Sequence, residues 1–91
     1  MNDKEIKAIE HTLEKNQEKM VLIELKGIVE ARWKFKHINI QVTEDRIIIR
    51  KEKEEIIAFN LHQLMKTRQE TNKKIRFEFD PMQTVDLTIM D

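Results

Sequence analysis

Residues 21–35 read VLIELKGIVEARWKF, and this stretch decides the fold. Apolar side chains occupy the odd positions from Val21 to Phe35, apart from Gly27, and most positions between them are charged. Successive side chains of a strand point to opposite faces, so the alternation predicts extended backbone with one buried face. We favour one strand over about 20–35, bent at Gly27, although a hairpin turn at this glycine would keep the same alternation.

The segment before this stretch has a helical pattern. Apolar residues at Ile6, Ile9 and Leu13 are spaced three and four apart, which predicts an amphipathic helix over about 3–19. Asn2 or Asp3 can cap its first turn with a side-chain oxygen. The single apolar stripe predicts that one face of this helix is buried.

The segments that follow alternate in the same way as residues 21–35. They predict strands over about 38–43, 46–50 and 55–59, and a C-terminal hairpin over about 74–79 and 85–90. A two-residue turn after Thr43 would pair Val42 with Ile47 and Ile40 with Ile49. In the C-terminal hairpin, a five-residue loop at 80–84 would pair Phe79 with Val85.

A second, shorter helix is predicted over about 61–70. Asn60 followed by Gln63 resembles a capping box, and Leu61, Leu64 and Met65 have helical spacing. We therefore expect one α+β domain over residues 1–91. An N-terminal amphipathic helix precedes a mostly antiparallel meander of five to six strands, with the short helix inserted before the C-terminal hairpin. A small, partly closed β-barrel is the alternative.

The composition excludes several classes of catalytic and cofactor-binding site. The chain has one glycine and no cysteine, and it also lacks serine. Without Ser or Cys there is no such nucleophile, and one glycine cannot build a phosphate-binding loop. The three histidines, His11, His37 and His62, lie far apart in the sequence, unlike zinc ligands. We expect a protein that is not an enzyme and uses no cofactor or metal.

Charge and hydropathy limit the expected cellular location and the expected binding partners of the protein. The longest apolar runs, 20–23 and 56–59, are too short to cross a bilayer, and residues 1–19 do not resemble a secretory signal. We expect a cytoplasmic protein with no membrane partner. The 17 basic residues balance 17 acidic residues, which argues against bulk attraction to nucleic acid.

Several apolar residues fall at positions that should face solvent, and such a group marks an interface. They are Leu22, Ile28, Ile48, Met82 and Met90. The leading hypothesis is a small interaction or regulatory module that contacts a partner protein, a second copy of itself, or both. Small domains gain core by self-association.

A nucleic-acid-binding β domain is the alternative. Arg32, Lys34 and Lys36 interleave with Trp33, which resembles a surface where aromatic rings stack on bases and cations hold phosphates. Strand alternation, however, places Trp33 on the face opposite to these basic residues. This hypothesis therefore requires a curled sheet whose rim presents both.

Overall fold

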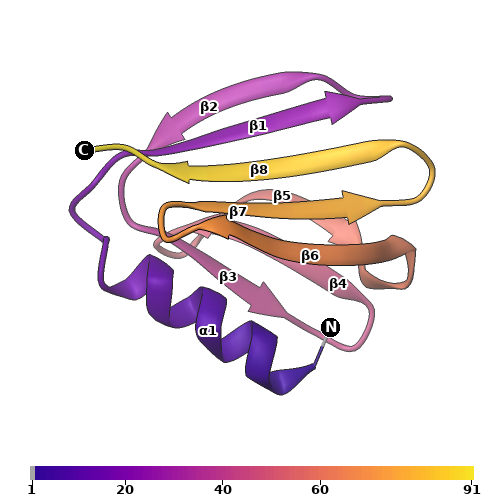
Figure 1. The fold of residues 1–91 in the computed structure, drawn as a ribbon, viewed down its shortest axis with the longest axis horizontal. Coiled ribbons are helices and arrows are strands. Elements are labelled where there is room, and N and C mark those ends of the chain that lie inside the picture. Colours follow the sequence, from indigo (N-terminus) through magenta and orange to yellow (C-terminus); the bar gives the residue numbers. More distant parts are fainter. Residues whose placement is uncertain (1) are drawn as a thin grey trace.

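The computed structural model describes residues 2–91 as one helix and eight strands in two antiparallel sheets (Figure 1). The five-stranded sheet has the order β2-β1-β8-β7-β6, and the three-stranded sheet has the order β3-β4-β5. The α+β class and the N-terminal helix are confirmed. Over the described residues the sheets do not close into a barrel, and the predicted single meander is wrong because β8 returns to pair with β1.

The elements follow one another with short links. In chain order they are α1 (Asp3–Glu14), β1 (Val21–Gly27), β2 (Ala31–Phe35), β3 (Ile38–Val42), β4 (Arg46–Lys51), β5 (Glu54–Asn60), the 3-10 turn η1 (Leu61–Gln63), β6 (Leu64–Thr71), β7 (Lys74–Phe79) and β8 (Gln83–Ile89).

The core lies between the two sheets. Inward-facing residues of β1, β7 and β8 alternate with outward-facing polar residues, as strand geometry requires. The fully buried members with the largest side chains include Phe77, Ile23, Leu87, Ile47 and Ile49. The predicted pairs Val42–Ile47 and Ile40–Ile49 are confirmed in the β3–β4 register.

Gly27 ends a strand and does not bend one. The expected continuous strand over 20–35 is a hairpin in which β1 pairs with β2 and Leu25 lies opposite Ala31. Gly27 has a φ of 128°, a conformation that side chains with a Cβ rarely adopt. The Cβ of any other residue here would lie 1.9 Å from the Met82 carbonyl oxygen. The β1–β2 and β7–β8 turns therefore touch at this glycine.

Helix α1 is shorter than the predicted span of 3–19. Asn2 caps its start by accepting a hydrogen bond from the Glu5 amide, as predicted. The helix ends at Glu14 because the apolar stripe ends, and two side-chain amides then satisfy its last carbonyls. Asn16 donates to the Thr12 carbonyl, and Gln17 donates both to the Leu13 carbonyl and to the Ile38 carbonyl of β3.

The predicted helix over 61–70 is wrong. The Asn60 side chain does accept from the His62 amide, but it caps only the single 3-10 turn η1. The chain then continues as β6, which pairs with β7 and forms the edge of the five-stranded sheet. Pairing with β7 outweighed the weak local helical pattern, and the β-branched Thr67 and Thr71 suit a strand.

The C-terminal hairpin is tighter than the predicted hairpin by two residues. Phe79 lies opposite Gln83, and Phe77 lies opposite Val85. The parity of the register is unchanged, so the predicted apolar faces still point inward. The tighter loop does change which residues lie opposite each other on the outer face: Arg76 lies directly opposite Asp86.

Candidate functional site

The structure separates the predicted interface residues into different regions. Ile28 lies in the β1–β2 turn and Met82 in the β7–β8 turn, and these turns meet at Gly27. Met90 lies at the opposite end of the sheet, where its amide donates to the Met20 carbonyl. Ile28 and Met82 thus lie in adjoining turns, and Leu22 and Met90 lie near the other end of the β1–β8 pair.

Ile48 and Leu22 are less exposed in the structure than Ile28 and Met82. Ile48 is only 3% exposed, although it faces away from the main core. Its cross-strand neighbours are Gln41 and Ala58, and the Arg50 guanidinium donates to the Gln41 side-chain oxygen beside it. Leu22 is half-buried on the outer face of β1. In the single chain, Ile48 is therefore covered on this sheet face, where the long Gln41 and Arg50 side chains lie beside it.

An apolar cleft opens where the β1–β2 and β7–β8 turns approach β5. Its volume is about 310 Å³. The lining residues come from both sheets and both turns: Leu25, Ile28, Val29, Ile57, Ala58, Phe59, Gln63, Phe79, Asp80, Pro81 and Gln83. Sequence reasoning identified only Ile28 among them as a contact residue, because most of the others alternate in strands like ordinary core residues.

The inner part of the cleft is aromatic. The rings of Phe59 and Phe79 stack with their centroids 4.8 Å apart and their planes inclined by 23°. Phe79 and Leu25 are buried, whereas Phe59 is half-buried. These side chains belong to the core but also line the cleft, so an apolar group that enters would contact the edge of the core directly.

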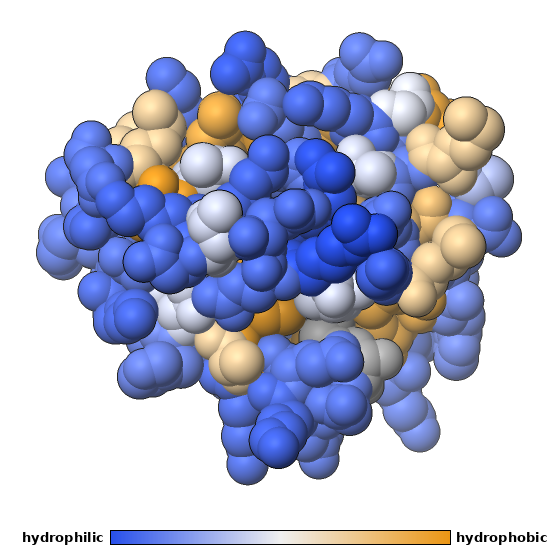
Figure 2. Space-filling view, in the orientation of Figure 1, coloured by the Kyte–Doolittle hydropathy of each residue, from blue (hydrophilic) through white to orange (hydrophobic). Residues whose placement is uncertain are grey.

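The rim of the cleft is apolar and exposed. Ile28 is 68% exposed and Val29 is 54% exposed. Figure 2 shows hydrophilic residues over most of the visible face, with apolar residues at its right edge, where Figure 1 places these turns, and other apolar residues at its upper left. Met82, at 86% exposed, and Met65 line a second hollow that shares Phe79 with the cleft. The apolar surface therefore continues beyond the cleft itself.

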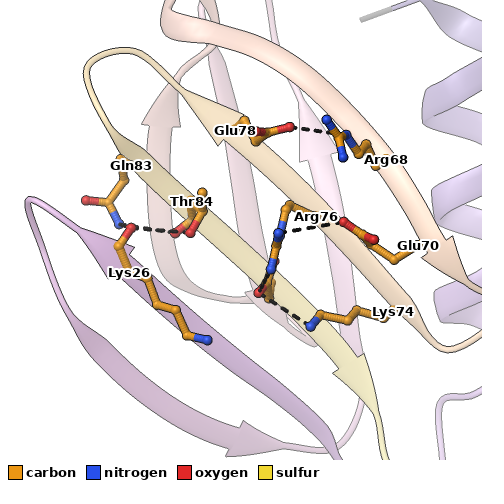
Figure 3. Close-up of polar contacts among 9 residues, drawn as sticks. Lys26, Arg68, Glu70, Lys74, Arg76, Glu78, Gln83 and Thr84 are labelled. Carbon is orange, nitrogen blue, oxygen red and sulfur yellow. Dashed lines mark hydrogen bonds and ion pairs between the residues drawn. The ribbon is translucent and has the colours of Figure 1, made fainter.

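Gln83 fixes the position of this rim. Its side-chain oxygen accepts from the Val29 amide at 2.8 Å, and its side-chain nitrogen donates to the carbonyls of Val29 at 2.9 Å and Lys26 at 3.1 Å. Figure 3 shows Gln83 reaching from β8 towards Lys26. These hydrogen bonds hold the β1–β2 turn against β8, so the exposed Val29 is presented in a defined place.

The cleft runs along an edge of the three-stranded sheet. Three consecutive residues of β5, from Ile57 to Phe59, line it. Since neighbouring side chains point to opposite faces, a cavity that touches all three must reach the side of the strand. Within residues 2–91, β5 pairs with β4 alone. The backbone edge of β5 therefore borders the cleft.

The opposite edge of the three-stranded sheet is covered. Helix α1 packs against β3 and buries Ile9 and Leu13 (Figure 1). A hydrogen bond of 3.5 Å joins Gln69 of β6 to Thr12 of α1. The amphipathic helix thus closes the gap between the two sheets on the β3–β6 side, whereas the cleft marks the side near β5.

The predicted nucleic-acid residues do not form one surface. Arg32 and Lys34 are exposed on the outer face of β2, and Arg32 pairs with Glu24 at 3.6 Å. Trp33 packs against the core on the other face, and Lys36 lies in the turn after β2. A stacking platform needs the aromatic ring beside the cations, and the structure does not bring them together.

Two titratable groups with shifted pKa values, Asp86 and Arg76, form a pair on the outer face of the five-stranded sheet (Figure 3). Asp86 is fully buried and receives two hydrogen bonds from the Arg76 guanidinium, at 2.8 and 3.0 Å. Burial alone would raise the pKa of Asp86, but the Arg76 hydrogen bonds and the charges of Arg76, Lys74 and Lys26 hold that pKa below its ordinary value of 3.8. Arg76 also pairs with Glu70 at 3.7 Å. Every polar atom of this group is engaged within the sheet, so its role is structural.

Residues 2–91 contain no cluster of three or more His, Asp or Glu side chains that could hold a metal ion. No helix in the same range has both the length and the apolar character needed to cross a membrane.

No protein-family model, no curated protein and no solved structure matches the chain.

Proposed function

We propose that this protein is an interaction module that binds an apolar segment of a partner protein in the cleft beside β5. The observation that carries the proposal is the exposed apolar rim of Ile28 and Val29 above a cleft lined by Phe59 and Phe79. Exposed apolar residues that continue into an aromatic pocket are the usual anchor site of a protein interface.

The shape of the site favours a protein segment over a free small molecule. Pockets for small ligands enclose about 300–1,000 Å³ and bury most of the ligand. This cleft, at about 310 Å³, is at the lower end of that range. Much of its apolar surface lies outside the cavity, on Ile28, Val29 and Met82. A partner that fills the cleft and also covers the rim would bury the whole of this apolar surface.

The rim is also prepared for binding. Because Gln83 already holds Val29 by two hydrogen bonds, the turn loses little conformational freedom when a partner contacts it. Preorganised surfaces retain more of their contact energy as affinity.

A displayed library of random decapeptides, selected on the immobilised protein, tests the proposal. Enriched peptides should carry apolar anchor residues, and their affinity should fall at least tenfold for Val29→Asp, because a charge on the rim cannot be desolvated in the interface. Met90→Asp is the matched control, since Met90 is an exposed apolar residue at the far end of the sheet.

The comparison of Val29→Asp with Met90→Asp decides whether the cleft is the binding site. If Val29→Asp and Met90→Asp bind the selected peptides equally well, or if no peptide is enriched, the cleft is not the binding site. Light scattering on the free protein separates the second-copy alternative: a dimer that Val29→Asp dissociates would mean that the chain occupies its own cleft.

A further inference from the structure

We infer that the partner segment binds as an added β-strand along the free edge of β5, and that basic residues flank its apolar positions. This inference rests on the proposed function and specifies the chemistry of the ligand. It combines two observations, the unpaired edge of β5 beside the cleft and the acidic residues around the cleft.

The first observation is the edge of β5. A strand with only one neighbour presents a row of unpaired backbone donors and acceptors on its other side. The middle of β5, residues 56–59, contains only apolar side chains. In contrast, the edge strand β6 carries Lys66, Arg68 and Glu70, and charged edges of this kind discourage pairing with another chain. Within the described chain, β5 is thus the edge whose centre lacks this protection while bordering a cleft.

The geometry of an added strand fits the cleft. Alternate side chains of an extended segment point to the same face, about 6.8 Å apart. A strand paired with β5 would therefore direct every second side chain between the sheets, towards Phe59, Phe79 and Val29. Its backbone would satisfy the free edge while its side chains fill the apolar space, which is how β-strand addition combines affinity with selectivity.

The second observation is the charge around the cleft. Asp80 is the one ionisable residue among those that line it, and it is exposed. Glu30 follows Val29 in the rim turn and is exposed as well. Across residues 2–91, neither of these two carboxylates forms an ion pair. A partner with Lys or Arg beside its apolar residues would complement them, and such charges direct partner choice and association rate.

The test uses synthetic versions of the best selected decapeptide. Two analogues carry N-methyl groups on alternate residues, one set for each edge of the extended peptide. Strand pairing requires only one edge, so one analogue should lose at least tenfold in affinity while the other retains binding. Hydrogen exchange of the complex should show new protection of backbone amides between Ile57 and Phe59.

Charge is tested separately with a double variant. Glu30→Gln with Asp80→Asn should weaken binding of a Lys-flanked peptide at least threefold at low salt and reduce the salt dependence of its affinity. Glu10→Gln with Glu14→Gln, on the exposed face of α1, is the matched control and should change neither.

Some outcomes would overturn this inference without removing the proposed function. Equal affinity of the two N-methylated analogues, or a helical bound peptide without new protection in β5, would exclude strand addition although the cleft is occupied. Selected peptides that lack Lys and Arg, or that bind the double variant unchanged, would exclude charge selection. Failure of the selection itself would contradict the proposed function as well.

Discussion

Gly27 shows how one residue can hold two turns in contact. Its φ of 128° and the Met82 carbonyl oxygen, which would lie 1.9 Å from any added Cβ, leave room for glycine alone. Gly27→Ala should lower the free energy of unfolding by at least about 2 kcal/mol, because the turns must separate or the backbone must adopt a strained conformation. Urea denaturation measures the loss. Glu30→Ala, exposed in the same turn, should change stability by less than about 0.5 kcal/mol, and similar midpoints for the two variants would contradict this account.

Asp86 gives the protein a defined sensitivity to acid. Its folded-state pKa lies below the ordinary carboxyl value of 3.8, so its contribution to stability is complete above that pH and is lost as the pH falls through the folded-state pKa. Asp86→Asn should lower the free energy of unfolding by about 2 kcal/mol at pH 7, since Arg76 loses its ionised partner. The loss should shrink as the pH falls below about 3.8, where the unfolded wild-type chain takes up the proton, and it should be gone once the folded carboxylate is protonated as well.

Denaturant titrations at several pH values test this dependence. Asp91→Asn serves as the comparison, because Asp91 pairs with Lys19 and Lys73 at the exposed surface, where an ion pair contributes about 0–1 kcal/mol. The structural role of Asp86 would be wrong if both variants lost the same stability at pH 7, or if Asp86→Asn kept the acid dependence of the wild type.

At the scale of elements, α1 acts as a cover between the sheets. Leu13 is 2% exposed, and truncating a buried leucine costs about 2–5 kcal/mol. Leu13→Ala should therefore lower the free energy of unfolding by about 3 kcal/mol and increase hydrogen exchange in β3, whose Ile38 carbonyl is tied to the helix through Gln17. Lys7→Ala on the exposed face of α1 is the control. Unchanged exchange in β3 with Leu13→Ala would show that the helix does not cover this sheet.

Elements could be predicted from the sequence where the pattern was strong and local. The alternation in residues 38–51 fixed both strands and the Val42–Ile47 register. The prediction for the segment after Asn60 was wrong because Asn60 does cap a helical turn, but only the single 3-10 turn η1 follows it. The partner that makes residues 64–71 a strand is β7, which comes later in the chain, so no local pattern could reveal it.

At the scale of the whole molecule, the site could not be predicted because it arises from the packing of two sheets. Alternation placed Phe79 on an inward face, but the continuous apolar run of residues 56–59 assigned no face to Phe59. Neither pattern can show that the two rings stack beside an open edge. Ile28 was identified because it is an apolar residue at a position that should face solvent in the predicted strand, whereas Gln83 gave no signal. Its role depends on a contact with a turn 54 positions earlier in the chain.

The contrast between the edge strands β5 and β6 has a consequence for how the protein behaves when it is concentrated. The charged side chains of β6 discourage that edge from pairing with another chain. The apolar centre of β5 instead resembles the short, uncharged, β-prone segments that nucleate fibrils. Any occupant that pairs with β5 would also act as a chaperone for this edge. We therefore expect the free chain to aggregate through β5 at high concentration. Co-expression with a peptide that binds β5 should raise the yield of soluble protein.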